Sequence, residues 1–136
     1  MIHSIDVEIT TPLYPTEVRD RVEDAIHQLF PDADIEERHG ELLAETHSLE
    51  RFAKRLDEQN IVPTARKVFF RGREGDTFRF ALKKAAAFQG VVNFAVGNPD
   101  ELGDVHVSVR VEEPDAEAFI DYIAPPDGNE DDADGE

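Results

Sequence analysis

Several kinds of residue and segment are scarce in this 136-residue chain. It contains no cysteine and no tryptophan, and it has a single methionine. Without cysteine, disulfide bonds and thiolate chemistry are excluded. No run of about 18 apolar residues occurs, and the first residues lack the basic and apolar regions of a secretory signal. These absences predict one cytoplasmic domain without a membrane segment.

Lysine is also scarce, and the overall charge is strongly acidic. The chain has four lysines and ten arginines against 31 acidic residues, which gives a formal net charge of −17. An acidic excess keeps a protein hydrated in concentrated salt, where carboxylates repel each other less because the screening length falls to about 3 Å at 1 M. An ordinary acidic protein with an acidic tail is the alternative. Because acidity also runs through the part expected to fold, the composition favours a halophilic protein.

The basic residues are gathered in one part of the chain. Residues 51–84 include ten basic and four acidic residues, a net charge of +6. The rest of the chain has four basic and 27 acidic residues, a net charge of −23. A protein that is acidic elsewhere and keeps its cations in one segment is expected to bind a polyanion such as nucleic acid.

Alternating apolar and polar residues predict strands with one buried face. Ile5, Val7 and Ile9 alternate with polar residues, and four valines alternate in the same way within residues 104–112. Segments with helical spacing lie between the strands, so helices should cover the buried face. The sequence predicts an α+β fold, a single mostly antiparallel sheet with helices packed on one face, in the order β-α-β-β-α-α-β-β-β-α. The expected strands are residues 5–10, 33–38, 41–46, 76–82, 91–96 and 104–112, and the expected helices are 16–30, 48–60, 64–71 and 114–123, with a short helical turn at 83–87.

The last residues differ in character from the rest. Residues 125–136 begin with two prolines and contain six acidic residues and no basic one. A segment of this composition cannot bury enough apolar surface to fold. We therefore expect a single α+β domain at residues 1–124, followed by a disordered acidic tail at residues 125–136.

The predicted helix at residues 64–71 carries the clearest candidate site. Its inward stripe leaves Arg66, Lys67, Phe70 and Arg71 outside the buried face. A ring among cations suits nucleic acid, since the cations contact phosphates and the ring stacks on a base. The alternative is that Phe70 packs under a neighbouring helix or in a dimer contact.

Two further basic features extend this candidate site. Arg73 lies in a Gly-x-x-Gly loop whose backbone amides can approach a phosphate, and the alternative is a helix stop followed by a turn. Lys83 and Lys84 precede a turn of small residues and could grip phosphates, and the alternative is a solvated pair. The candidate nucleic-acid-binding residues are Arg66, Lys67, Phe70, Arg71, Arg73, Lys83 and Lys84.

No pattern typical of catalysis or metal binding is present. The five histidines are scattered without metal-ligand spacing, and no nucleophile elbow, Walker loop or dinucleotide-binding fingerprint occurs. We therefore expect no catalytic residue, no metal site and no cofactor. An enzyme would need a carboxylate site with raised pKa values, which a sequence does not reveal.

Four short segments carry a resemblance to a known family: Ser-Leu-Glu-Arg at residues 48–51, Ala-Arg at 65–66, Arg-Gly at 71–72, and the run at 84–94 that begins Lys-Ala-Ala-Ala-Phe. They resemble an uncharacterised archaeal family of predicted RNA-binding proteins, over roughly residues 5–123. The resemblance implies a fold like that of the large-subunit ribosomal protein that binds 5S rRNA. A sister family has been proposed to associate with the RNA exosome.

One departure from the family pattern concerns the two lysines. The family usually has Asn-Lys-Gln before Ala-Ala-Phe, whereas this chain has Lys83-Lys84-Ala85, so only Lys84 carries over. The sequence as a whole predicts a non-catalytic RNA-binding accessory protein from a halophilic archaeon, with rRNA or another structured RNA as its partner. The alternative is a protein-interaction or homodimer module of unknown process, in which the basic helices dock an acidic partner or the protein's own tail.

Overall fold

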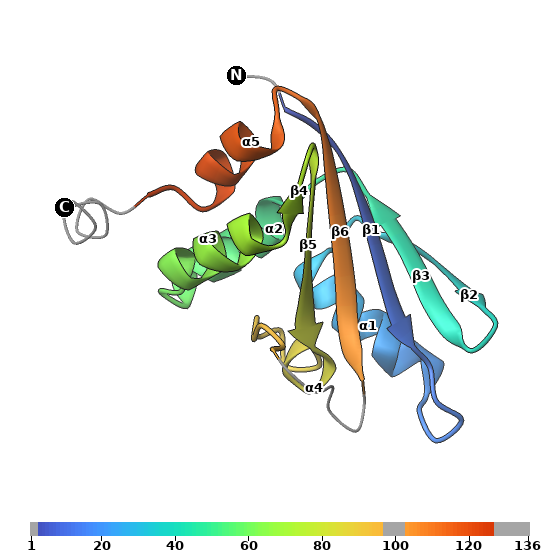
Figure 1. The fold of residues 1–136 in the computed structure, drawn as a ribbon. Helices are drawn as coiled ribbons and strands as arrows, with labels where there is room; N and C mark the ends of the chain where they lie inside the picture. Colours follow the sequence, from blue (N-terminus) through green and yellow to red (C-terminus); the bar gives the residue numbers. More distant parts are fainter. Residues whose placement is uncertain (1–2, 97–102, 127–136) are drawn as a thin grey trace.

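The molecule is built on one antiparallel sheet. The computed structural model describes residues 3–96 and 103–126, so most of the polar segment 97–103 between the last two expected strands and most of the predicted acidic tail lie outside the described residues. Within the described part, six strands form the sheet in the order β2-β3-β1-β6-β5-β4 (Figure 1). The strands are β1 Ser4–Pro12, β2 Asp34–Arg38, β3 Glu41–Thr46, β4 Arg73–Glu74, β5 Thr77–Lys83 and β6 Asp104–Glu113.

Five helices in the described ranges cover one face of this sheet. Along β1, Ile5, Val7 and Ile9 are buried while Glu8 is exposed, and β6 alternates in the same way, so each central strand has one dry and one wet face. The predicted α+β class with a single antiparallel sheet is therefore confirmed. The helices are α1 Arg19–Leu29, α2 Glu50–Glu58, α3 Val62–Arg71, α4 Lys84–Ala87 and α5 Ala116–Ile123.

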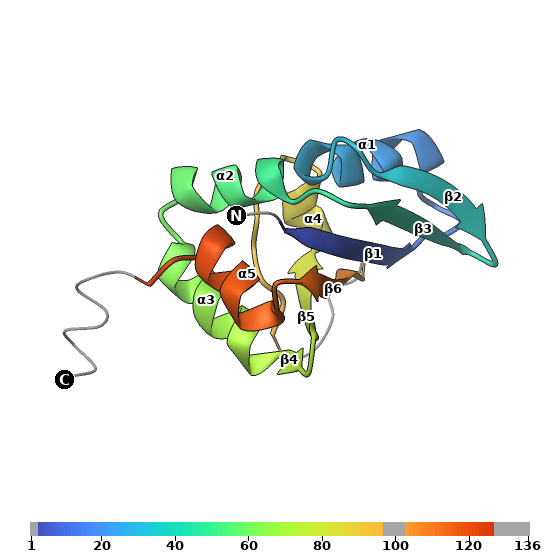
Figure 2. The same cartoon turned by 90° about the horizontal axis from the view of Figure 1, so that it is seen from above.

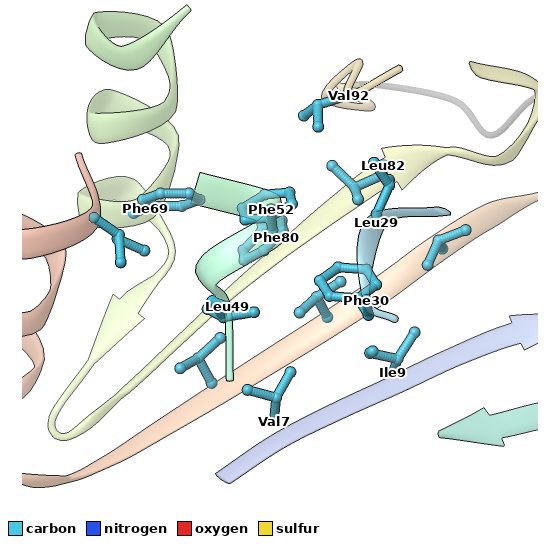
Figure 3. Packing of buried hydrophobic residues seen from close by; sticks show 14 of the residues in the cluster. Val7, Ile9, Leu29, Phe30, Leu49, Phe52, Phe69, Phe80, Leu82 and Val92 are labelled. Atoms are coloured by element: carbon cyan, nitrogen blue, oxygen red, sulfur yellow. The ribbon is translucent and has the colours of Figure 1, made fainter. Parts of the chain in front are cut away.

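A cluster of phenylalanine rings joins the helices to the sheet. The ring of Phe52 in α2 lies 5.4 Å from Phe80 in β5 and 5.4 Å from Phe30, which follows α1. Phe69 in α3 lies 5.0 Å from Phe80 and 5.1 Å from Phe78, and all these distances are between ring centroids. Figure 3 shows Phe52, Phe69 and Phe80 close together beside β5, with Phe30 nearer to Ile9 of β1. The cluster fixes α2 and α3 side by side and leaves their outer faces to solvent.

The segment 91–96, expected to be a strand, forms only an isolated bridge between Phe94 and Leu82 of β5. The chain returns toward β5 after Gly90, whose φ of +70° favours glycine. The side chain of Gln59, just after α2, then binds both backbone groups of Val92, because its amide donates to the Val92 carbonyl and its oxygen accepts from the Val92 N–H, each at 2.9 Å. A side chain thus occupies the place of a neighbouring strand, which stops a regular ladder.

The first helix also begins later than predicted. The sequence predicts a helix at residues 16–30, whereas α1 starts at Arg19 and residues 14–17 form a turn, closed by a hydrogen bond from Glu17 N to Tyr14 O at 2.9 Å. The Glu17 carboxylate accepts from Tyr14 N at 3.0 Å and from Lys84 Nζ at 2.8 Å. These long-range contacts hold the turn, and the helix starts after it.

Adjacent phenylalanines in α3 allow a matched test of the core. We expect Phe69→Ala to lower the free energy of unfolding by about 3–5 kcal/mol, because it removes a fully buried ring from the cluster. Phe70→Ala should cost less, about 1–2 kcal/mol, because Phe70 is only partly buried. Urea denaturation of both variants measures the difference, and equal losses would contradict this assignment of the core.

Candidate nucleic-acid interface

The ten basic residues of the segment 51–84 divide into two groups. Four of them form ion pairs: Arg55 with Glu58 at 2.9 Å, Arg66 with Asp121 at 2.7 Å, Arg79 with Glu74 at 4.0 Å, and Lys84 with Glu17 at 2.8 Å. The other six make no ion pair with any residue that the structure describes. These six are Arg51, Lys54, Lys67, Arg71, Arg73 and Lys83.

The unpaired cations are on neighbouring elements, with one exception. Arg51 and Lys54 lie on α2, and Lys67 and Arg71 lie one turn apart on the exposed side of α3, which packs beside α2. Arg73 follows in β4, next to the end of α3. Lys83 lies at the other end of β5 from β4, a strand length of roughly 20 Å away. The structure therefore brings together Lys67, Arg71 and Arg73 but separates Lys83 from them.

Arg66 and Phe70 are engaged within the protein. The Arg66 guanidinium donates to Asp121 Oδ1 at 2.7 Å and to the Ala124 carbonyl at 3.1 Å, and its side chain is 19% exposed. Its Cζ atom lies 4.9 Å from the centroid of the Phe70 ring, which also packs against the core. This arrangement differs from the expectation of a free cation and a free ring, because Arg66 attaches α5 to α3 and Phe70 packs against the core and the Arg66 guanidinium.

The expectation of a surface phosphate contact at Lys84 needs correction. Lys84 is 0% exposed, and its ammonium donates to the Pro12 carbonyl and to Glu17 Oε1 and lies 5.2 Å from the Tyr14 ring centroid. The alternation of β5 gives the reason, since Phe78, Phe80 and Leu82 point into the core and Lys84 is next in the same period. Lys84 therefore fastens the turn before α1 to the start of α4.

The neighbouring lysines provide a matched stability test. We expect Lys84→Met to lower the free energy of unfolding by about 3–5 kcal/mol, because it leaves the Glu17 carboxylate, which is 8% exposed, without its cation. Lys83→Met should change it by less than about 0.5 kcal/mol, because Lys83 is in no ion pair with the described residues. Adding Glu17→Gln to Lys84→Met should restore part of the loss, and urea denaturation measures all three variants. A Lys84→Met protein as stable as the parent would contradict the role of this pair.

A groove that sequence analysis did not identify lies between α2, α5 and the start of β1. Its volume is about 810 Å³. It is built from parts of the chain that are far apart in the sequence, and Tyr122, a large side chain that remains exposed, stands on its wall. The lining residues are His3, Ile5, His47, Ser48, Leu49, Glu50, Ala53, Lys54, Asp57, Val62, Pro63, Phe119, Tyr122, Ile123, Pro125 and Pro126.

His47, which lines this groove, has a raised pKa. Its Nδ1 lies 3.0 Å from the Ile5 carbonyl oxygen and 3.1 Å from Asp6 Oδ1. The hydrogen bond to the Ile5 carbonyl is the main cause of the raised pKa, and the charges of Asp6 and Glu45 add to it. Protonation of His47 is therefore favoured in the folded state, and Arg110 holds Asp6 in place from the other side at 2.6 Å.

This pKa gives a pH-dependence with a definite sign. A group with a raised folded pKa stabilises the protein below its unfolded pKa, about 6.5 for histidine, and the contribution disappears as the pH rises through the folded pKa. The effect should be small, because the His47 side chain is 77% exposed. An NMR titration should give a higher pKa for His47 in the folded protein than in urea, and Asp6→Asn should lower the folded value. A folded pKa at or below the unfolded one would contradict the hydrogen bond.

The chain is similar to proteins of other archaea. A family model described as RNA binding matches residues 6–113. A UPF0200/UPF0201 protein of Archaeoglobus fulgidus is 37% identical over 123 residues, which cover 90% of this chain but only 38% of that protein. A UPF0201 protein of Methanopyrus kandleri is 37% identical over 137 residues, covering 88% of this chain and 84% of the relative.

Solved structures agree with these relatives. The crystal structure of a UPF0201 protein from Methanococcus jannaschii superposes with a TM-score of 0.84 at 32% sequence identity, covering 92% of this chain and 96% of the other. The matched model places the chain in a class of proteins whose description is RNA binding. Within this class, the chain belongs to the UPF0201 family. No helix among the described residues is long and apolar enough to cross a membrane.

Proposed function

We propose that this protein binds structured RNA through the outer faces of α2 and α3 and through β4, and that it catalyses no reaction. The observation that carries the proposal is the set of unpaired cations on these elements, in a chain whose net charge is −17. Such a chain has more than enough carboxylates to neutralise every cation. Five cations on adjacent elements nevertheless have no acidic partner among the described residues, so they are suited to binding a polyanion. They are Arg51, Lys54, Lys67, Arg71 and Arg73.

The types of side chain indicate how the RNA would be held. Arginine and lysine contacts to phosphate fix the position of a nucleic acid and carry little sequence information. Sequence preference at these cations should therefore be weak. The family resemblance implies a fold like that of the ribosomal protein that binds 5S rRNA, and this supports a structured RNA as the partner. Since Lys84 is buried and Arg66 is paired, Lys67, Arg71 and Arg73 are the main contacts in this proposal, and Lys83 would contribute only to an RNA long enough to reach the other end of β5.

The proposal includes a high-salt cytoplasm as the working environment. The acidic composition supports it, because carboxylates keep a surface hydrated when salt is concentrated. At such ionic strength the release of counterions contributes less to RNA affinity. The planar guanidinium of Arg71, which can bind a phosphate with two parallel hydrogen bonds, should then matter more than a point charge.

The exposed pair on α3 is the place to test the proposal. We expect the double variant Lys67→Gln/Arg71→Gln to bind an archaeal rRNA fragment more weakly than the parent. The logarithm of the binding constant should also fall less steeply with the logarithm of the salt concentration, by about 1–2 in slope, because two phosphate contacts are lost. Filter binding of rRNA and tRNA across a salt series measures both quantities.

A matched control removes the same charge elsewhere. Arg21→Gln/Arg38→Gln takes two exposed arginines from α1 and β2 and should leave the salt slope of the parent unchanged. If both double variants weaken binding equally, the effect is one of net charge and the assigned surface is wrong. If the parent binds no RNA at any salt concentration that keeps it folded, the proposed function is wrong. A dimer detected by light scattering in such a protein would favour the protein-interaction module instead.

A further inference from the structure

The groove beside α2 has the size of a ligand site and an aromatic wall. Its volume of about 810 Å³ falls within the range of roughly 300–1,000 Å³ that is typical of small-molecule sites. Figure 2 shows α2 and α5 on either side of the start of β1, where the groove lies. Because nothing described fills it, the chemistry of its lining has to indicate the occupant.

Tyr122 presents a ring that is held firmly yet remains accessible. The ring of His3 stacks on it, with centroids 4.4 Å apart and an angle of 30° between the planes. Phe119, which is buried, supports both rings, at 5.4 Å from His3 and 6.2 Å from Tyr122. Tyr122 is nevertheless 62% exposed. A ring that is held by neighbouring rings and is still exposed offers a surface on which a flat ligand can stack. Unpaired RNA bases bind proteins by stacking on aromatic side chains.

Cations lie where the phosphates beside a bound base would run. Lys54 lines the groove and has no acidic partner among the described residues, and Arg51 lies one turn before it on α2. On the other side, Pro63 lines the groove, and Lys67 and Arg71 follow it at intervals of four residues on α3. Lys54 is thus the cation on the groove wall, and Arg51, Lys67 and Arg71 lie on the helices beyond it, where the backbone on either side of a bound base could reach them.

Two carboxylates on the α2 wall restrict which base would fit. Glu50 and Asp57 line the groove, and their carboxylates make no hydrogen bond or ion pair with the described residues. They would repel a phosphate, but they can accept a hydrogen bond from the exocyclic amino group of a base. Cytosine, adenine and guanine carry such a group, and uracil does not.

From these observations we infer that the groove binds one unstacked, amino-bearing base of a single-stranded RNA segment, which lies on the ring of Tyr122. The inference rests on the proposed function, because it adds a base-binding site to a surface that contacts phosphates. The inferred ligand is a base, whereas the cations of α2 and α3 contact phosphates and do not distinguish one base from another. Bases flanking a structured region are its natural occupants.

The tyrosine content of the chain provides a direct test. There are two tyrosines and no tryptophan, so Tyr14→Phe leaves Tyr122 as the only tyrosine. Its fluorescence should be quenched on titration with ten-nucleotide oligocytidylate or oligoadenylate, after correction for absorption by the RNA, and much less with oligouridylate. In the converse variant Tyr122→Phe, the fluorescence of Tyr14 should not respond, because Tyr14 lies near Lys84 and away from the groove.

Affinity gives a second, independent measurement. Tyr122→Ala should weaken the binding of oligocytidylate roughly 5- to 150-fold, the range found on removing one base–aromatic stack, and Tyr122→Phe should retain it. Glu50→Gln/Asp57→Gln should reduce the preference for oligocytidylate over oligouridylate. Circular dichroism checks that each variant is folded, and the salt slope should stay that of the parent in Tyr122→Ala, because no cation is lost.

The outcomes separate this inference from the proposed function. If Tyr122→Ala binds every RNA as the parent does while Lys67→Gln/Arg71→Gln loses affinity, the inference that the groove binds a base is wrong and the proposed function stands. If Tyr122→Ala abolishes a dimer and bases quench nothing, a second copy of the chain occupies the groove and the inference is overturned. If removing residues 127–136 opens the groove to bases that the full chain excludes, the inference is also overturned, because the tail is then the occupant. Absence of binding to any RNA overturns both.

Discussion

The contact of Phe80 with two helices is the interaction on which the rest of the structure depends. Phe52 and Phe69 both pack on this one ring, so α2 and α3 are fixed against the same strand. The apolar face of each helix packs in this contact, and its charged face is turned to solvent. The position of the cations is thus set by aromatic packing beneath them, since cations that repel one another would not gather unaided. The wall of the groove that α2 supplies is fixed by the same contact.

Much of the fold could be predicted because its signals are local. The alternation around Val7 and Val109 is visible within a few residues, and both proved to lie on buried positions of central strands. The parts that could not be predicted depend on contacts between distant residues. Gln59 reaches Val92 and Glu17 reaches Lys84, and neither pairing leaves a trace in the local pattern. Strand 91–96 and the start of α1 were predicted wrongly for this reason.

Contacts between distant residues also decide which of the predicted site residues are exposed. Lys84 follows the alternation of its strand, and the residue type led to the expectation of a solvent-exposed cation. Its burial is possible because Glu17 and the Pro12 carbonyl compensate its charge. Arg66 has the helical position of a surface cation, and its partner Asp121 lies 55 residues later. Lys67 and Arg71 remain exposed as expected, because no acid from another element reaches them within the described residues. Concentration of charge in a sequence therefore identifies a candidate surface, and only the tertiary partners identify which of its members are available.

The clamp that Gln59 places on Val92 has a consequence for the sheet as a whole. It keeps residues 93–95 against β5, where Lys83 N donates to Asn93 O and Ala95 N donates to Ala81 O, each at 2.8 Å. With β4 at the other end of β5, this border of the sheet offers few unpaired backbone groups for strand addition by another molecule. The opposite border, β2, carries charged side chains instead, with Glu36 paired to Arg38 and Glu37 paired to Arg19, and the effect of such surface charges weakens as salt is added. A hydrogen-bonded segment that covers an edge strand blocks strand addition at any ionic strength. At high salt the two borders would therefore be protected unequally, and β2 would be the edge at which copies of the protein first associate.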